Sequence, residues 1–228
     1  MKRIYLIRHG ESEANVDLRE YALTPDHRIS LTQKGIDEAT ETGKFLKKHF
    51  EELSQNLGYI PKIRIYFSSY TRTRQTKDAI MTYIGNMVDC AYEDNRLVEQ
   101  RFGDFDGLTE EQQKKEHPKA YAKLQLQIKH QGKYWAGYPG AGGESPYDVD
   151  MRTESLKGTF YRDYEKHGIE YVVVISHGIT TRVMANNYLR LSYEDYHDEK
   201  NPDNASVRML EKLDSGWVDR RYLFSPEI

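Results

Sequence analysis

Cysteine is nearly absent from this chain of 228 residues, which contains only Cys90. A single thiol cannot close a disulfide within the chain, and it excludes a zinc site built from several cysteines. Long apolar runs are missing too. The opening "MKR" is followed by only four apolar residues, too few for the core of a signal peptide, and no run is long enough to span a bilayer. We therefore expect a soluble, cytoplasmic protein without a membrane partner.

An excess of positive charge is also missing. The chain has 33 Lys and Arg residues against 36 Asp and Glu residues, which gives a formal net charge of −3, and it has no basic stripe. Because domains that bind nucleic acid usually carry a basic face, we expect no nucleic-acid partner. No internal repeat or linker interrupts the sequence, so residues 1–228 are expected to form a single domain.

Hydrophobic patterning predicts alternating strands and helices. The run "YVVVIS" (Tyr171 to Ser176) is the most apolar in the chain and is typical of a strand buried on both faces of a parallel sheet. Other strands are predicted at 4–7, 62–67 and 87–93, helices at about 31–53, within 68–84, and at 109–130, 145–167 and 177–189, and a closing hairpin at 206–213 and 216–224. This order predicts an α/β domain of three layers (α/β/α) with a mostly parallel central sheet and a central helical insertion at about 108–145.

The first long predicted helix has an apolar face. In "LTQKGIDEATETGKFLKKHFEEL" the residues Ile36, Ala39, Phe45 and Leu46 recur at helical spacing, and Thr32 stands near the position of an N-cap. We therefore expect these four apolar side chains to face the core.

Histidine-glycine pairs end two of the predicted strands. "LIRHG" places His9 after the first strand, "VISHG" places His177 after the most apolar one, and "SSYTRTRQT" places Arg72 after the strand at 62–67. In α/β proteins ligands bind at the carboxyl ends of parallel strands, so these groups are expected to converge at one edge of the sheet. The other histidines are expected to be structural: His27, His49, His117, His130, His167 and His197.

Four motifs follow one another along the chain: "RHGESEAN", "SSYTRTRQT", "RLVEQRFGDFDGLT" and "VISHGITTRVM", with "LTQKG" and "GGES" between them. Together they resemble the signature of the histidine phosphatase superfamily, the group that contains the cofactor-dependent phosphoglycerate mutases. The resemblance runs from Arg8 to about Arg182, which is most of the chain, and is greatest to small acid-phosphatase-like members.

This resemblance implies a catalytic set that transfers a phosphoryl group: Arg8, His9, Arg72, Glu99 and His177. His9 would attack the phosphomonoester, which requires a neutral imidazole whose other nitrogen is tied to a backbone carbonyl. Arg8 and Arg72 offer planar forks that match phosphate oxygens, and His177 would be held protonated by the phosphate. Glu99 would protonate the leaving oxygen and then take a proton from water.

Four further residues are assigned to substrate binding. Asn15 matches the phosphate-contacting asparagine of the family, and Gly178 opens a predicted helix, so its amide would face the anion. Ser12 and Arg101 complete the assignment. Ser12 and Arg101 could reach the pocket but could equally lie on the surface. The same is true of Tyr21, Thr24, Gln100 and Tyr147.

No metal and no cofactor are expected, because three cationic side chains suffice to neutralise the phosphate and the sequence lacks the usual carboxylate clusters. The predicted partner is a small phosphomonoester, such as a phosphorylated metabolite, which the enzyme would hydrolyse through a phosphohistidine. The identity of this substrate and the oligomeric state, including a homodimer, stay open.

Three alternatives compete with this interpretation. Cys90 and Arg96 have the spacing of a cysteine-dependent phosphatase, although Glu93 and Asp94 between them would repel a phosphate dianion. A non-catalytic phospho-ligand binder on the same fold would usually lack the nucleophile or the acid, and both are present here. The third alternative is a phosphoglycerate mutase.

The acid segment argues against the mutase. The family resemblance implies that a mutase has a lysine just after the "GL" of this segment and an adjacent arginine pair in the insertion, both serving the substrate carboxylate. Here "GLTEE" places Thr109, Glu110 and Glu111 there, and no Arg-Arg pair lies between residues 107 and 144. Two carboxylates in that place would weaken the binding of an anion, so we predict a phosphatase.

Overall fold

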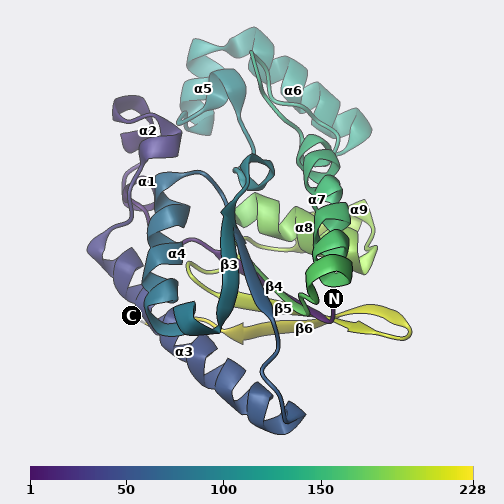
Figure 1. Ribbon diagram of the computed structural model, residues 1–228. Coiled ribbons are helices and arrows are strands. Elements are labelled where there is room, and N and C mark those ends of the chain that lie inside the picture. The colour runs from purple at the N-terminus through teal and green to yellow at the C-terminus, as the bar shows by residue number, and fades with distance from the viewer. Residues whose placement is uncertain (228) are drawn as a thin grey trace.

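The computed structural model describes residues 1–227, and a six-stranded sheet lies at its centre (Figure 1). The strand order is β3-β2-β4-β1-β5-β6. The strands are β1 (Arg3–Arg8), β2 (Ile63–Phe67), β3 (Val88–Glu93), β4 (Tyr171–Ser176), β5 (Val207–Leu213) and β6 (Gly216–Phe224). Strands β3, β2, β4 and β1 pair in parallel, while β5 runs antiparallel to β1 and forms the predicted hairpin with β6.

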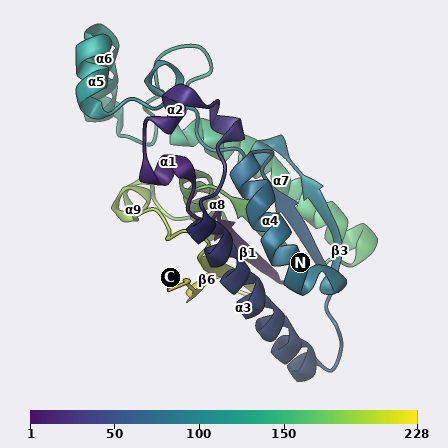
Figure 2. The ribbon, with the colours of Figure 1, turned by 90° about the vertical axis from the view of Figure 1, so that its left-hand side faces the viewer.

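Helices cover both faces of the sheet (Figures 1 and 2). On one face α3 (Gln33–Leu57) and α4 (Thr71–Ile84) pack through Phe50 and Ile80 against alternate strand residues such as Val173. On the other face α7 (Pro146–His167) and α8 (Gly178–Leu189) pack through Phe160 and Met184. All six residues of β4 are buried, as expected for a strand covered on both sides. The predicted three-layer α/β/α fold with a mostly parallel sheet is confirmed.

The buried face of α3 differs from the predicted one. Ala39 and Leu46 are fully buried, but Ile36 is exposed and Phe45 only partly buried. The buried side of α3 includes the small residues Gly35, Ala39, Thr42 and Gly43, because α3 lies very close to α4. A Cβ on Gly43 would lie 2.8 Å from a side chain of α4 and 3.1 Å from its backbone.

The insertion contains two helices where the pattern predicts one helical stretch. They are α5 (Glu110–Glu116) and α6 (Pro118–Gln131), separated at His117. The break has a local cause, because proline disfavours a helical conformation in the residue before it but is well tolerated at the start of a helix. Both helices extend beyond the end of the sheet, at the top of Figure 1.

Several short elements escaped the sequence pattern. They are the helices α1 (Glu13–Val16), α2 (Glu20–Leu23) and α9 (Tyr193–Asp198), and the 3₁₀ turns Asp26–Arg28, Gly85–Met87, Asn95–Leu97 and Gly103–Phe105. A single helical turn is too short to show a hydrophobic period, which is why none was predicted. Within residues 1–227, no helix is both long and apolar enough to cross a membrane.

Candidate active site

The two histidine-glycine pairs meet at the carboxyl ends of β1 and β4. These strands are parallel neighbours in which Arg8 pairs with Ser176, so His9 and His177 leave the sheet at the same level. The backbone N–H of His9 donates to the carbonyl of Ser176 at 2.9 Å, and the two imidazole centroids lie 5.2 Å apart. The sheet register therefore brings the two predicted catalytic histidines together.

His9 is held in one tautomer. Its Nδ1 lies 2.7 Å from the carbonyl oxygen of Gly10, and because a carbonyl only accepts, Nδ1 carries the proton and Nε2 is left with a free lone pair. The close approach of the backbone to α3 requires Gly10, since a Cβ on this residue would lie 2.2 Å from the carbonyl oxygen of Gly35. Burial, together with the positive charges of Arg72 and Arg8, lowers the pKa of His9 well below its ordinary value. His9 is therefore neutral and can act as a nucleophile.

Two arginines surround this histidine. Arg8 ends β1 and donates from Nη1 to the carbonyl of Pro202 at 2.7 Å, while its Nε is buried and has no protein partner. Burial lowers the pKa of Arg8, an effect that the charge of Glu99 opposes. Arg72 lies in the first turn of α4, is 3% exposed, and has its guanidinium over the ring of Tyr70. The positive charge of both groups lies where a phosphate would meet His9.

Asp26 is a residue of the site that the sequence analysis missed. The Nη1 of Arg72 donates to the Asp26 carboxylate at 2.8 Å and to the Asp26 carbonyl at 2.7 Å. Asp26 thus occupies one edge of the guanidinium and fixes its orientation. A phosphate that binds Arg72 must use the remaining N–H groups or displace this carboxylate.

His177 has no hydrogen-bonded carboxylate partner. Its Nε2 lies 2.9 Å from the Ser68 hydroxyl, its Nδ1 is buried with no protein partner, and the ring of Tyr70 packs edge-on at 5.0 Å. Burial is the main cause that lowers the pKa of His177 well below its ordinary value, and Arg72 and His9 add to it. The protein's own groups therefore disfavour the protonated imidazole, and the third positive charge that the sequence analysis expected requires a bound anion that raises the pKa of His177.

Glu99 lies against the N-terminus of α8, directly after His177. Its Oε2 accepts from the backbone N–H of Ile179 at 3.2 Å, and its Oε1 accepts from the N–H of Thr180 at 3.1 Å and from that of Gln100 at 3.0 Å. The hydroxyl of Thr180 lies 3.1 Å from Oε1 as well. The predicted acid is thus a cap of the helix that begins at the second histidine, and this fixes it beside the site.

Asn15, Ser12 and Gly178 also lie at this edge of the sheet. Ser12 is buried, and its backbone N–H donates to the Asn15 side-chain carbonyl at 3.0 Å, which also accepts from Asn204 at 3.1 Å. Gly178 is buried at the first position of α8 beside His177. Their contacts with substrate stay predictions.

Arg101 lies further out than the other predicted binding residues. Its guanidinium is 55% exposed and pairs with Glu144 at 3.2 Å, a carboxylate that Arg152 also holds at 2.9 Å. The contact of Arg101 with substrate stays a prediction.

The sequence analysis left four residues open, and the structure places each of them differently. Tyr21 packs against Gly107 of the acid segment, where a Cβ on the glycine would lie 2.4 Å from the Cβ of Tyr21, and burial raises the pKa of the Tyr21 hydroxyl. Gln100 is buried and lines a pocket described below. Thr24 ends α2 at a half-buried position. Tyr147 instead packs in an aromatic cluster, with its ring 4.6 Å from that of Trp135.

The cysteine-phosphatase alternative does not fit the structure. Cys90 lies within β3, paired with Arg64 of β2, and is not in a loop that could surround a phosphate. Arg96 forms an ion pair with Asp94 at 2.6 Å. Among residues 1–227 there is also no group of three or more His, Cys, Asp or Glu side chains that could hold a metal ion.

The remaining residues that sequence reasoning missed are Ser68, Pro202 and Asn204. Ser68 follows β2 directly, and its place as the first residue of "SSYTRTRQT" was a usable signal. Pro202 and Asn204 lie between 189 and 195 residues from the groups that they contact, in an irregular segment before β5, and no local pattern marks them.

The comparisons with known proteins agree with this geometry. The sequence model of the histidine phosphatase superfamily (branch 1) matches residues 4–223. Two phosphoglycerate mutase-like proteins of Arabidopsis thaliana are 35% and 31% identical to this chain, over 92% and 94% of its length. A broad-range acid phosphatase of Saccharomyces cerevisiae (strain ATCC 204508 / S288c) is 24% identical over 91% of this chain and 84% of the yeast protein. The chain spans 65% of the first Arabidopsis protein and 75% of the second.

Solved structures share the fold. A mycobacterial glucosyl-3-phosphoglycerate phosphatase in complex with VO3 superposes with a TM-score of 0.72 at 22% identity and covers 100% of both chains. The alpha-ribazole phosphatase from Shigella flexneri superposes with a TM-score of 0.72 at 18% identity, over 99% of this chain and 98% of the other. At this level of identity the similarity concerns the arrangement of the sheet and helices.

Proposed function

This chain belongs to the histidine phosphatase superfamily, and from that membership we propose that it is a metal-independent phosphomonoester hydrolase that acts through a phosphohistidine at His9. The observation that carries the proposal is the hydrogen bond from Nδ1 of His9 to the Gly10 carbonyl, which leaves Nε2 free beside Arg8 and Arg72. We further propose that the substrate is a small phosphorylated molecule and that the enzyme works in the cytoplasm.

The first half of the reaction transfers the phosphoryl group to the protein. Nε2 of His9 attacks phosphorus in line, the bond between phosphorus and the leaving oxygen breaks, and Glu99 gives that oxygen a proton. Arg8 and Arg72 neutralise the equatorial phosphate oxygens, which is most of what a protein contributes to this kind of transfer. The backbone amide of Gly178 and the positive end of the α8 dipole also favour the negative charge of the phosphate.

The second half returns the histidine. Glu99, now ionised, takes a proton from a water molecule that attacks the phosphohistidine, and the bond between Nε2 and phosphorus breaks to release inorganic phosphate. The α8 amides and the Thr180 hydroxyl that contact Glu99 hold its carboxylate in one place through both steps. Acid and base are therefore one residue in two protonation states.

The insertion supports hydrolysis over phosphoglycerate isomerisation. Thr109 caps α5 through the N–H of Gln112, and Glu110 and Glu111 form the first turn of this helix. Both carboxylates are exposed where the mutases are expected to place a cation. The acid phosphatase of yeast among the relatives points the same way.

Supplying 3-phosphoglycerate with catalytic 2,3-bisphosphoglycerate tests the proposal directly. We expect release of inorganic phosphate to exceed the formation of 2-phosphoglycerate. The reason is that this chain has Glu110 and Glu111 in the place where a mutase is expected to have a lysine that binds the carboxylate of phosphoglycerate. Both products are followed in one assay, together with a panel of other phosphomonoesters, with and without EDTA. Isomerisation much faster than phosphate release would favour the mutase, and loss of activity in EDTA would contradict metal independence.

The pH profile of kcat/KM is expected to have its acid limb well below 6.5, the ordinary histidine value, because burial, Arg72 and Arg8 lower the pKa of His9. Protonation of His9 removes the nucleophile, so activity is lost as the pH falls through this lowered pKa. Arg72→Gln removes a positive charge, raises the pKa of His9, and should move the acid limb to higher pH.

Arg74→Gln is the matched control for this shift. Arg74 lies on the same helix but is half-exposed and paired with Glu93. It should leave the limb unchanged, and a limb that is equally unmoved in Arg72→Gln would show that Arg72 does not tune His9.

A further inference from the structure

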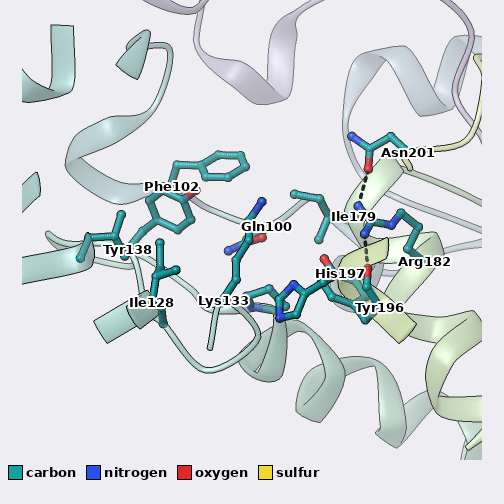
Figure 3. Close-up of a pocket in the computed structure, with 13 residues that line it drawn as sticks. Gln100, Phe102, Ile128, Lys133, Tyr138, Ile179, Arg182, Tyr196, His197 and Asn201 are labelled. Carbon is teal, nitrogen blue, oxygen red and sulfur yellow. Dashed lines mark hydrogen bonds between the residues drawn. The ribbon is translucent and has the colours of Figure 1, made fainter. Parts of the chain in front are cut away.

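A pocket of about 160 Å³ lies beside Glu99, between the insertion and α8 and α9 (Figure 3). Figure 3 shows Gln100 in the middle, Phe102, Tyr138 and Ile128 on one side, and Ile179, Arg182 and Asn201 on the other. The pocket is smaller than the roughly 300 Å³ at which sites for drug-sized molecules begin, so it suits a small group.

The pocket adjoins the acid side of the phosphate site. Gln100 follows Glu99 in the chain, and Ile179 donates its backbone N–H to the Glu99 carboxylate. Asn201 lies close to Gly178, since a Cβ on Gly178 would be 3.1 Å from the Asn201 side chain. Glu99 also lies close to His177, because its carboxylate accepts the N–H groups at the start of α8, whose N-cap is His177. A group bonded to the oxygen that Glu99 protonates would therefore extend into this pocket.

The lining combines apolar and cationic groups. Apolar or aromatic side chains form most of the wall: Phe102, Leu124, Ile128, Ala136, Tyr138, Pro146, Ile179 and Tyr196. Lys133 and Arg182 supply positive charge, and no aspartate or glutamate is among the lining residues described for this pocket. Such a lining favours a leaving group that is partly apolar and negatively charged.

Arg182 is held in place without being neutralised. Its Nη1 donates to Asn201 at 3.0 Å and its Nη2 to the Tyr196 carbonyl at 2.5 Å, while its Nε is buried with no protein partner. Within residues 1–227 neither Arg182 nor Lys133 has a carboxylate within 4.0 Å. Both side chains therefore keep a full charge for a ligand.

We propose that this pocket holds the leaving group of the substrate and selects phosphomonoesters whose leaving group is small, largely apolar and anionic, with a carboxylate as the group that Arg182 and Lys133 recognise. This inference rests on the proposed phosphatase function. It deepens that function by assigning the specificity to residues outside the catalytic set.

Two matched substrates test the charge preference: 4-carboxyphenyl phosphate and 4-carbamoylphenyl phosphate. They have nearly the same shape, and the carboxamide has the intrinsically better leaving group, so chemistry alone favours the neutral compound. We expect kcat/KM of the wild type to be higher for the carboxylate by about tenfold or more, the scale of a charge-assisted hydrogen bond. A ratio of one or below would overturn the proposal.

Substitutions identify the residues responsible. Arg182→Gln and Lys133→Gln should each lower the ratio toward one, and Arg182→Lys, which keeps the charge, should retain most of it. Lys129→Gln is the matched control, because Lys129 lies on α6 in the same insertion but is exposed and outside the pocket lining. The proposal fails if the ratio is unchanged in Arg182→Gln and Lys133→Gln, or if Lys129→Gln lowers it equally.

Failure of the phosphatase function would look different. In that case neither compound is hydrolysed, and calorimetric Kd values of the two uncleaved phosphates decide about the pocket. Tighter binding of the carboxylate that is lost in Arg182→Gln would support the pocket assignment, and equal Kd values would overturn it.

Discussion

His9→Ala is expected to abolish phosphomonoesterase turnover, with kcat lowered by a factor of about 10⁴ or more, the scale reached when a covalent nucleophile is removed. The bond from Nδ1 of His9 to the Gly10 carbonyl leaves its Nε2 with a free lone pair, and His177 cannot replace it, because its Nε2 already contacts the Ser68 hydroxyl. Steady-state rates on an aryl phosphate measure the loss.

Direct detection of the intermediate completes this experiment. Mass spectrometry after quenching without acid should show a phosphoryl group on His9 in the wild type and none in His9→Ala. His167→Ala serves as the control, since His167 is exposed at the end of α7. Substantial turnover by His9→Ala would end the assignment of His9 as the nucleophile.

Glu99→Gln should lower kcat by about 10² to 10⁴ for alkyl phosphates, the contribution typical of a general acid. Aryl phosphates with good leaving groups need little protonation, so their rates should fall much less. The comparison uses 4-nitrophenyl phosphate and a simple alkyl phosphate under the same conditions.

The difference between the two substrates separates catalysis from structure. Glu99 accepts backbone N–H groups with both carboxylate oxygens, and a glutamine amide would place a donor against one of them. Loosening of α8 by that mismatch would slow both substrates alike. Equal losses on both would therefore leave Glu99 the role of a helix cap and remove it from acid catalysis.

The position of Asp26 shows how the site combines neutral and charged groups. The lowered pKa values of His9 and His177 keep both imidazoles uncharged, so the positive charge of the phosphate site comes from Arg8 and Arg72. One edge of Arg72 already contacts the Asp26 carboxylate. The Asp26 carboxylate therefore balances part of this charge in the structure.

The catalytic edge of the sheet could be predicted from short stretches of the sequence. Apolar runs predicted the strands, and each of three runs was followed within a few residues by its functional group: His9 after β1, Arg72 after β2, and His177 after β4. These are short-range relations along the chain, and the parallel pairing that apolar strands of this kind require brings their carboxyl ends together.

The arrangement of the groups around this edge depends on contacts between distant parts of the chain. The Asp26 contact with Arg72, the capping of α8 by Glu99 and the pocket of Lys133 and Arg182 join residues that are between 46 and about 80 positions apart. The buried face of α3 was likewise set by its close approach to α4. Contacts of this kind depend on the path of irregular segments, which have no hydrophobic period, so they arise only when the whole chain packs.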